Sequence, residues 1–288
     1  MMIKRSLAAV FAAIMLLGTA VAEQALSGKA LPIDFSPGVA PDPAGYVGEM
    51  YYSDPSLTIS IEKGRQEECD FWVADIRIAH PSQLRTAAAD GFDSDMVMPA
   101  TALANRMNAV LAIDGDYYNY KSEGFTLRQG ELFENKLTGK RDVLYIDEDG
   151  DFHIQRLARK GSGRKEIDGK KVVNAFFFGP TLVENGELND QFACDGMACG
   201  DPSQRMCIAQ VGKLHYKVIC CGAPERGSEG MTIRQFAKLV YSCGVQTAYN
   251  LDGGNSTMLI FNGEKLNDVD NPKARDIADI IYFASAAE

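Results

Sequence analysis

The chain carries, at residues 249–258, an apolar strand that runs into Asp252-Gly253-Gly254 and then into a second apolar run. Two adjacent glycines let the backbone turn through positive φ and approach a ligand closely. Asp-Gly alone is a strong hairpin signal. The turn is flanked by more short polar side chains than a plain turn requires, at Asn250, Asn255, Ser256 and Thr257. The stretch predicts two strands, with a hairpin turn and a ligand site as alternatives.

The N-terminus predicts export. Lys4 and Arg5 precede an apolar stretch that is too short to span a bilayer, and a small-residue cleavage signal follows at residues 20–22. We therefore expect residues 1–22 to be a signal peptide and the protein to be secreted or held in the cell envelope. Residues 23–56 are rich in Pro, Gly and Asp, and they predict an extended arm or linker. Residues 57–288 are then one domain.

Short apolar runs separated by turn residues predict a fold made mostly of strands. Hairpins are expected at residues 126–133 and 143–154, and paired strands at 205–221. The clearest helix is residues 232–242, where Thr232 and Gln235 form a capping box. This pattern favours the α+β class, as a single domain with mixed, mostly antiparallel twisted sheets flanked by a few helices.

The net charge and the cysteines limit which partners and cofactors the protein is expected to bind. The formal net charge of −10 argues against nucleic acid or an anionic membrane as a partner. In an oxidising compartment, Cys194 paired with Cys199 or Cys207 would make a local disulfide. No cysteine pair has the spacing of a zinc knuckle, so no cofactor is expected, although a structural divalent cation near the acidic residues stays open. The oligomeric state is not predictable from these features.

A second predicted strand ends in the same Asp-Gly motif, at Asp114-Gly115, and Asp116 follows directly. If the ends of the two strands converge, their carboxylates form an acid/base or nucleophile pair. Arg205 and Arg275 each stand at or near the start of a predicted strand. The planar fork of an arginine suits phosphate or carboxylate.

These features resemble the phosphodiester glycosidase family, which includes the uncovering enzyme that removes N-acetylglucosamine from a phosphodiester on glycoproteins, and bacterial exported proteins of the exopolysaccharide-biosynthesis type. The resemblance spans about residues 70–284. It is carried by five ordered stretches, at residues 112–118, 177–186, 204–210, 249–256 and 275–279. The family usually has Asn where this chain has Asp114, small residues at Met206 and Cys207, and often Gly at Asn255. These departures bear on the substrate more than on the fold.

The resemblance implies cleavage of a sugar C1–O bond in a sugar-1-phosphodiester of the cell envelope or an exopolysaccharide. It implies Asp252 as the carboxylate at the anomeric carbon or its water, with Asp114 or Asp116 as the second carboxylate. The expected substrate-binding residues are Arg205, Arg275, Asn250, Gly253, Gly254, Asn255, Ser256 and Tyr117, with Tyr118 as a further candidate for stacking on a sugar face.

Two alternatives remain open from the sequence. The first is a non-catalytic envelope protein that binds anionic polysaccharide through the same groove. The second is a metal-dependent phosphodiesterase, because Asp114, Asp116 and Asp252 offer the oxygen ligands that Mg²⁺, Ca²⁺ or Mn²⁺ prefer.

Overall fold

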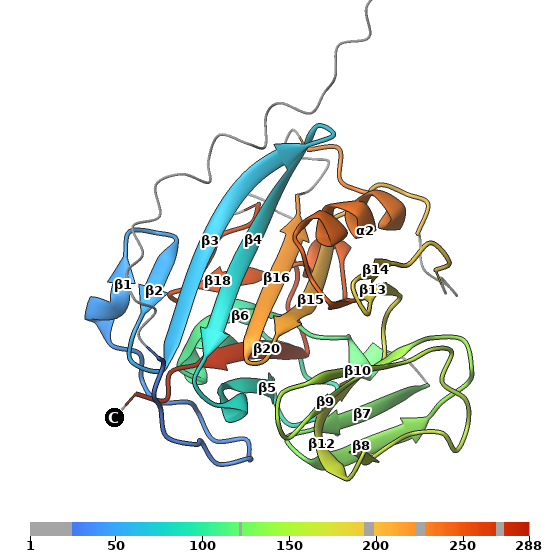
Figure 1. Ribbon diagram of the computed structural model, residues 1–288, viewed down its shortest axis with the longest axis horizontal. Coiled ribbons are helices and arrows are strands. Elements are labelled where there is room, and N and C mark those ends of the chain that lie inside the picture. Colours follow the sequence, from blue (N-terminus) through green and yellow to red (C-terminus); the bar gives the residue numbers. More distant parts are fainter. Residues whose placement is uncertain (1–24, 121–122, 193–198, 223–227, 269–273, 288) are drawn as a thin grey trace, which may run out of the picture.

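The computed structural model describes residues 25–120, 123–192, 199–222, 228–268 and 274–287. The predicted signal peptide at residues 1–22 lies outside these ranges. The described chain forms three antiparallel β-sheets that share one core, with two α-helices packed on their outer faces (Figure 1).

The largest sheet has nine strands and is built around a long hairpin, β3 and β4, which Figure 1 shows beside β16. The apolar side chains of β4 alternate between two faces, because successive residues of a strand point to opposite sides. In spatial order the strands are β1 (Tyr46–Val47), β2 (Tyr51–Ser53), β3 (Leu57–Gln66), β4 (Cys69–Ile78), β16 (His215–Cys221), β15 (Arg205–Gly212), β17 (Thr247–Asn250), β13 (Thr181–Glu184) and β14 (Glu187–Leu188).

The other two sheets have five and six strands. The five-stranded sheet runs β19 (Glu264–Lys265), β18 (Leu259–Phe261), β6 (Ala109–Asp114), β20 (Asp279–Ala284) and β5 (Leu84–Ala88). The six-stranded sheet runs β10 (Phe152–Gln155), β9 (Val143–Asp147), β12 (Lys170–Phe176), β7 (Gly124–Arg128) and β8 (Glu131–Lys136), with β11 (Glu166–Ile167) paired to β12. The hairpins expected at residues 126–133 and 143–154 are present as β7–β8 and β9–β10.

The helices cover the sheets from outside. Helix α2 (Ile233–Ser242) begins at the predicted capping box, in which the Thr232 hydroxyl accepts from the Gln235 N–H, and its apolar face packs on the nine-stranded sheet. Helix α1 (Ala100–Arg106) packs its alanines and Leu103 on the five-stranded sheet. Neither helix has the length and apolarity needed to cross a membrane.

One hydrophobic cluster joins the three sheets. It brings together side chains such as Trp72 of the nine-stranded sheet, Ile113 of the five-stranded sheet and Leu144 of the six-stranded sheet. All strand pairings between the described residues are antiparallel, so the expected sheet direction is confirmed, and strands dominate the fold. The α+β class holds only in the sense that these two α-helices accompany a largely β structure.

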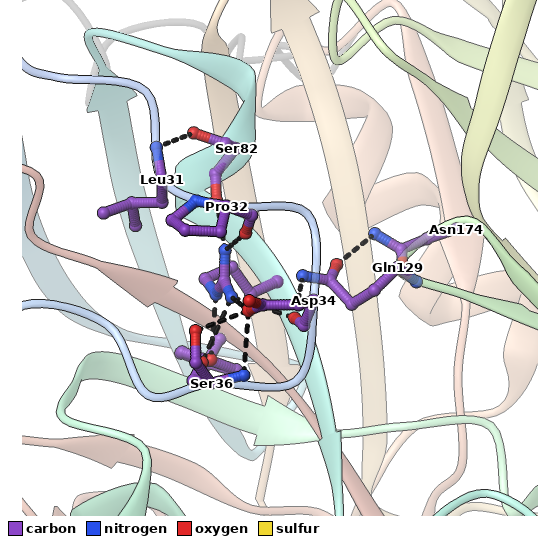
Figure 2. A network of polar contacts seen from close by, with 9 residues as sticks. Leu31, Pro32, Asp34, Ser36, Ser82, Gln129 and Asn174 are labelled. Atoms are coloured by element: carbon purple, nitrogen blue, oxygen red, sulfur yellow. Dashed lines mark hydrogen bonds and ion pairs between the residues drawn. The ribbon is translucent and has the colours of Figure 1, made fainter.

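Residues 25–56, expected as an arm or linker, contribute β1 and β2 to the nine-stranded sheet. The preceding loop is held by the buried Arg85 of β5. The Arg85 guanidinium donates to the backbone carbonyls of Pro32, Asp34 and Ser36 (2.7, 2.9 and 3.1 Å). The Asp34 carbonyl also accepts from Gln129 Nε2 at 2.9 Å, so the loop joins β5 to the β7–β8 turn (Figure 2).

Five cysteines are free thiols in the described part of the chain: Cys69, Cys207, Cys220, Cys221 and Cys243. The expected alternative pairing of Cys194 with Cys207 is therefore wrong. Cys194 lies outside the described residues, so its pairing with Cys199 stays a prediction.

Candidate active site

The two strand ends that carry Asp-Gly meet at one place. Strand β6 ends at Asp114 and strand β17 ends at Asn250, two residues before Asp252. The Asp252 N–H donates to the Gly115 carbonyl at 3.2 Å, and this hydrogen bond ties the five-stranded sheet to the nine-stranded sheet. Two carboxylates that are 138 residues apart in sequence therefore lie at the same junction.

A small cavity of about 10 Å³ opens beside these residues, and we call it the acid pocket. Four of its lining residues are aspartates, and two of these, Asp114 and Asp279, are almost completely buried. It is lined by Asp114, Gly115, Tyr117, Asp252, Ser256, Asp276, Ile277, Ala278 and Asp279.

Asp279, the first residue of β20, approaches Gly115 very closely. The Gly115 N–H donates to the Asp279 carbonyl at 3.2 Å. A Cβ atom added at residue 115 would stand 2.2 Å from the Asp279 Oδ2 atom. Gly115 is therefore required for the space that it leaves to the neighbouring carboxylate, and not only for its role in a turn.

Burial and mutual repulsion raise the pKa of both enclosed carboxyls. Burial, followed by the charge of Asp252, raises the pKa of Asp114 well above its usual range. Burial, followed by the charge of Asp116, raises the pKa of Asp279 to about 7, while Arg128 acts in the opposite direction. The acid pocket therefore holds one carboxyl group, that of Asp279, which can exchange a proton near neutral pH.

Asp116 lies behind the acid pocket and does not line it. Its carboxylate accepts from Arg128 Nη2 at 2.7 Å and from the Phe177 N–H at 2.8 Å. Arg128 is fully buried, packs on the ring of Phe176, and also lies 3.6 Å from Asp279 Oδ2. Asp116 is therefore the ion-pair partner of the buried Arg128, and it does not line the pocket in which a ligand would bind.

The second cavity, of about 180 Å³, adjoins the first at Asp252, and we call it the arginine pocket. Arg205, at the start of β15, donates from Nε to the Met231 carbonyl (3.0 Å) and from Nη2 to the Asp201 carbonyl (2.7 Å). These two backbone carbonyls orient the guanidinium. The pocket is lined by Phe178, Ser203, Arg205, Asn250, Leu251, Asp252, Gly253 and Gly254.

Asn250 offers a hydrogen-bond acceptor in the arginine pocket. Its Nδ2 donates to the carbonyls of Gly179 and Leu251, at 2.9 and 3.0 Å. Its Oδ1 is buried and makes no hydrogen bond within the protein. A buried acceptor of this kind is costly unless it is satisfied, so it favours a ligand with a hydroxyl or N–H group.

The glycine turn differs from the expectation in one respect. Only Gly254 has positive φ, at +59°, whereas Gly253 is extended with φ −147°. The Gly253 N–H donates to Asp252 Oδ1, and the Gly254 N–H donates to the Gln204 carbonyl. Both N–H groups therefore have acceptors within the protein: the Gly253 N–H orients Asp252, and the Gly254 N–H ties the turn to Gln204.

Arg275 contacts two residues of the acid pocket, whereas Arg205 lines the arginine pocket. Its Nε donates to the Ser256 hydroxyl at 2.7 Å, and its guanidinium stacks over the Tyr117 ring at 5.2 Å. Ser256 and Tyr117 both line the acid pocket. The two arginines thus serve different pockets.

Three of the expected binding residues line neither pocket: Arg275, Asn255 and Tyr118. The carbonyl of Asn255 accepts from the Arg275 N–H. The Tyr118 hydroxyl donates to the carbonyls of Gly91 and Ser94, so this ring holds a neighbouring loop.

The ligand set expected for a divalent cation is not assembled. Among the described residues, no three His, Cys, Asp or Glu side chains are arranged to hold a metal ion. Of the three aspartates considered as ligands, Asp116 is turned toward Arg128, which leaves Asp114 and Asp252 at the junction.

Sequence reasoning missed Asp279 and Arg128 as site residues. Asp279 lies inside the segment predicted as the last strand, which was expected to begin at Asp276, whereas in the structure it is the first residue of β20, so no strand-end signal marked it. Arg128 gave none, because an arginine before a Gln-Gly hairpin turn is ordinarily exposed.

Several solved structures and one curated protein are similar to this chain. The catalytic domain of zebrafish N-acetylglucosamine-1-phosphodiester α-N-acetylglucosaminidase, auto-inhibited by its pro-peptide, superposes with a TM-score of 0.62 at 16% identity, covering 81% of this chain and 85% of that one. A Synechocystis protein superposes with a TM-score of 0.61 at 15% identity, covering 79% and 62%. These likenesses show a shared fold.

The SPβ prophage-derived protein YomE of Bacillus subtilis strain 168 is 22% identical over 194 residues. This match covers 64% of the chain but only 29% of YomE, so the chain spans less than a third of that relative's length. The sequence model of the phosphodiester glycosidase family matches residues 107–284, which include the acid pocket and the arginine pocket. The chain therefore belongs to the phosphodiester glycosidase family.

Proposed function

We propose that this protein is an exported glycoside hydrolase that cleaves the sugar C1–O bond of a sugar-1-phosphodiester from the cell envelope or an exopolysaccharide. The observation that carries the proposal is the position of Asp252, which lines both the acid pocket and the arginine pocket. The Asp252 carboxylate then lies between the aspartates of the acid pocket and the guanidinium of Arg205. Family membership supports the reaction class, and the signal-like residues 1–22 support export.

The chemistry of a phosphate leaving group fits a site with an acidic pocket beside a pocket that carries an arginine. A phosphate oxygen has a low pKa, about 6 even for its second ionisation, so it leaves with little help from a general acid. The larger requirements are to hold its negative charge and to stabilise the oxocarbenium-like carbon. Arg205 meets the first requirement and Asp252 meets the second.

The remaining residues are assigned by their position. We place the phosphate in the arginine pocket, against Arg205, and the anomeric carbon beside Asp252. Asn250 Oδ1 accepts from a donor group of the substrate in the same pocket. Arg275 acts through Ser256 and Tyr117, which it holds at the rim of the acid pocket.

The test is hydrolysis of a panel of synthetic methyl diesters of sugar 1-phosphates in H₂¹⁸O. Cleavage of the C1–O bond places the label in the C1 hydroxyl of the released sugar, which is the result expected here. Label in the phosphate would show P–O cleavage and would identify a phosphodiesterase instead. No turnover of any diester, together with retained binding of anionic polysaccharide, would identify a binding protein.

A further inference from the structure

The acid pocket has the size and the lining of a site for a single water molecule. Its volume of about 10 Å³ is close to the smallest volume that holds one water. A buried water also needs two to four polar partners. The pocket offers carboxylate oxygens from three elements: Asp114 ends β6, Asp279 begins β20, and Asp252 follows β17.

Two of these oxygens make no hydrogen bond within the protein. Asp114 Oδ1 accepts from the Met258 N–H at 2.8 Å, whereas Asp114 Oδ2 is buried and has no hydrogen bond. Asp279 Oδ2 is likewise buried without a hydrogen bond, although Arg128 Nη2 lies 3.6 Å away. Buried carboxylate oxygens are rarely left in this state, so both point to a small polar ligand in the pocket.

We propose that the acid pocket binds the water that attacks C1, and that Asp279 takes the proton of this water. The inference rests on the function proposed above. The water oxygen forms a bond to C1 while the bond from C1 to the phosphate oxygen breaks. The electron pair of the broken bond leaves with the phosphate monoester in the arginine pocket, and the proton of the water passes to the Asp279 carboxylate. The products are a reducing sugar and a phosphate monoester, so atoms and charge balance.

Geometry distinguishes Asp279 from Asp114 as the base. Asp279 lies near the cationic Arg128, which favours its ionised form, and Gly115 leaves its Oδ2 room in the pocket. Asp114 has no cation in hydrogen-bond contact and faces the charge of Asp252. Asp279 interacts electrostatically with five charged or titratable groups, namely Asp116, Arg128, Asp252, Asp114 and Tyr118.

The pKa directions agree with this assignment. With a pKa raised to about 7, Asp279 is partly ionised at neutral pH and is well matched to accept a proton. Burial and the charge of Asp252 also raise the pKa of Asp114 well above its usual range.

A single displacement follows from the positions of the two pockets. The two pockets share Asp252 as a lining residue, and in the proposed arrangement water from the acid pocket approaches C1 on the face opposite the phosphate in the arginine pocket. A water activated by a carboxylate on the face opposite the leaving group gives inversion at C1, as in inverting glycosidases. The reaction then forms no covalent glycosyl-enzyme.

The first measurement uses the wild-type enzyme and the diester that it cleaves fastest. NMR of the sugar released in the first turnovers, before mutarotation, is expected to show the anomer opposite to that of the substrate. Release of the same anomer, or a trapped glycosyl-enzyme, would overturn the inference while leaving the C1–O cleavage of the proposed function intact. If the wild type cleaves no C1–O bond, the proposed function itself fails, and the inference fails with it.

The second measurement compares Asp279→Asn with Asp147→Asn. Asp147 of β9 has the same 2% exposure, and its Oδ2 lies 2.9 Å from His153 Nε2, away from both pockets. We expect Asp279→Asn to lower kcat by about 10²- to 10³-fold with little change in KM, and Asp147→Asn to keep wild-type kcat. The kcat/KM of the wild type should rise with pH up to about 7, and this limb should disappear in Asp279→Asn. A folded Asp279→Asn enzyme with turnover within threefold of the wild type, or with an unchanged pH limb, would contradict the role of Asp279.

Discussion

The acid pocket and the arginine pocket differ in almost every property except their shared wall at Asp252. The first has a volume of about 10 Å³ and is lined by four aspartates, whereas the second has about 180 Å³ and carries Arg205. Burial and neighbouring charges raise the pKa of Asp114 and of Asp279 in the acid pocket, while backbone carbonyls orient the Arg205 guanidinium in the arginine pocket. Under the proposed function, this difference separates proton transfer in the acid pocket from phosphate binding in the arginine pocket, and Asp252 lines both.

The largest expected effect on kcat comes from removing the Asp252 carboxylate, which lines both pockets. Asp252→Asn keeps the shape of the side chain but removes the negative charge that faces both pockets. We expect kcat to fall by about 10³-fold, the range found for a positioned carboxylate or base, with the fold retained. Steady-state kinetics on the best diester measures the loss, and thermal unfolding controls for stability. A decrease below tenfold would mean that the two pockets work independently.

A smaller effect is expected when only the arginine pocket is changed. Arg205→Ala removes the cation that we assign to the phosphate, and we expect kcat/KM to fall by about 10²-fold, the value of one charge-assisted hydrogen-bonded pair. Arg205→Lys should recover part of this loss, because it keeps the charge and loses the fork. The matched control is Arg234→Ala, since Arg234 lies on α2, away from both pockets. Equal kinetics for Arg205→Ala and the control would place the phosphate elsewhere.

The smallest effect concerns stability and belongs to the acid pocket alone. The pKa of Asp279 is about 7 in the folded protein and near 3.8 without its surroundings. Between these values the unfolded chain loses the proton first, so this group makes stability fall as pH rises from about 4 to 7. We expect the Tm of Asp279→Asn to exceed that of the wild type by a few degrees at pH 8 and to match it at pH 4. Calorimetry at both pH values checks this, and a lower Tm at pH 8 would show that Asp279 stabilises the fold when it is charged.

The parts of the fold that depend on neighbouring residues could be predicted from the sequence. Helix α2 begins at Thr232 because its cap is formed within one turn, and the β7–β8 hairpin follows from Gln129-Gly130. In both cases the hydrogen bonds that define the element join residues close in sequence.

The candidate site was predictable only in part, because its decisive contacts join distant strands. The sequence pointed to Asp114 and Asp252 through their shared strand-end motif. It did not reveal that Asp279 would pack against Gly115, or that Asp116 would turn toward the buried Arg128. Those outcomes depend on how β7 and β20 are placed beside β6, and no local pattern encodes that placement.

The loop at residues 32–36 has a consequence for proteolysis. A cut beside Asp34 would break no bond within either pocket, yet it would release the carbonyl that both Arg85 and Gln129 use. The buried guanidinium of Arg85 would then lose acceptors that water does not readily replace. Because Gln129 follows Arg128 directly in the chain, loosening this turn would reach the ion pair with Asp116 behind the acid pocket. We therefore expect a cut in the N-terminal segment to affect the order of the carboxylates at the acid pocket.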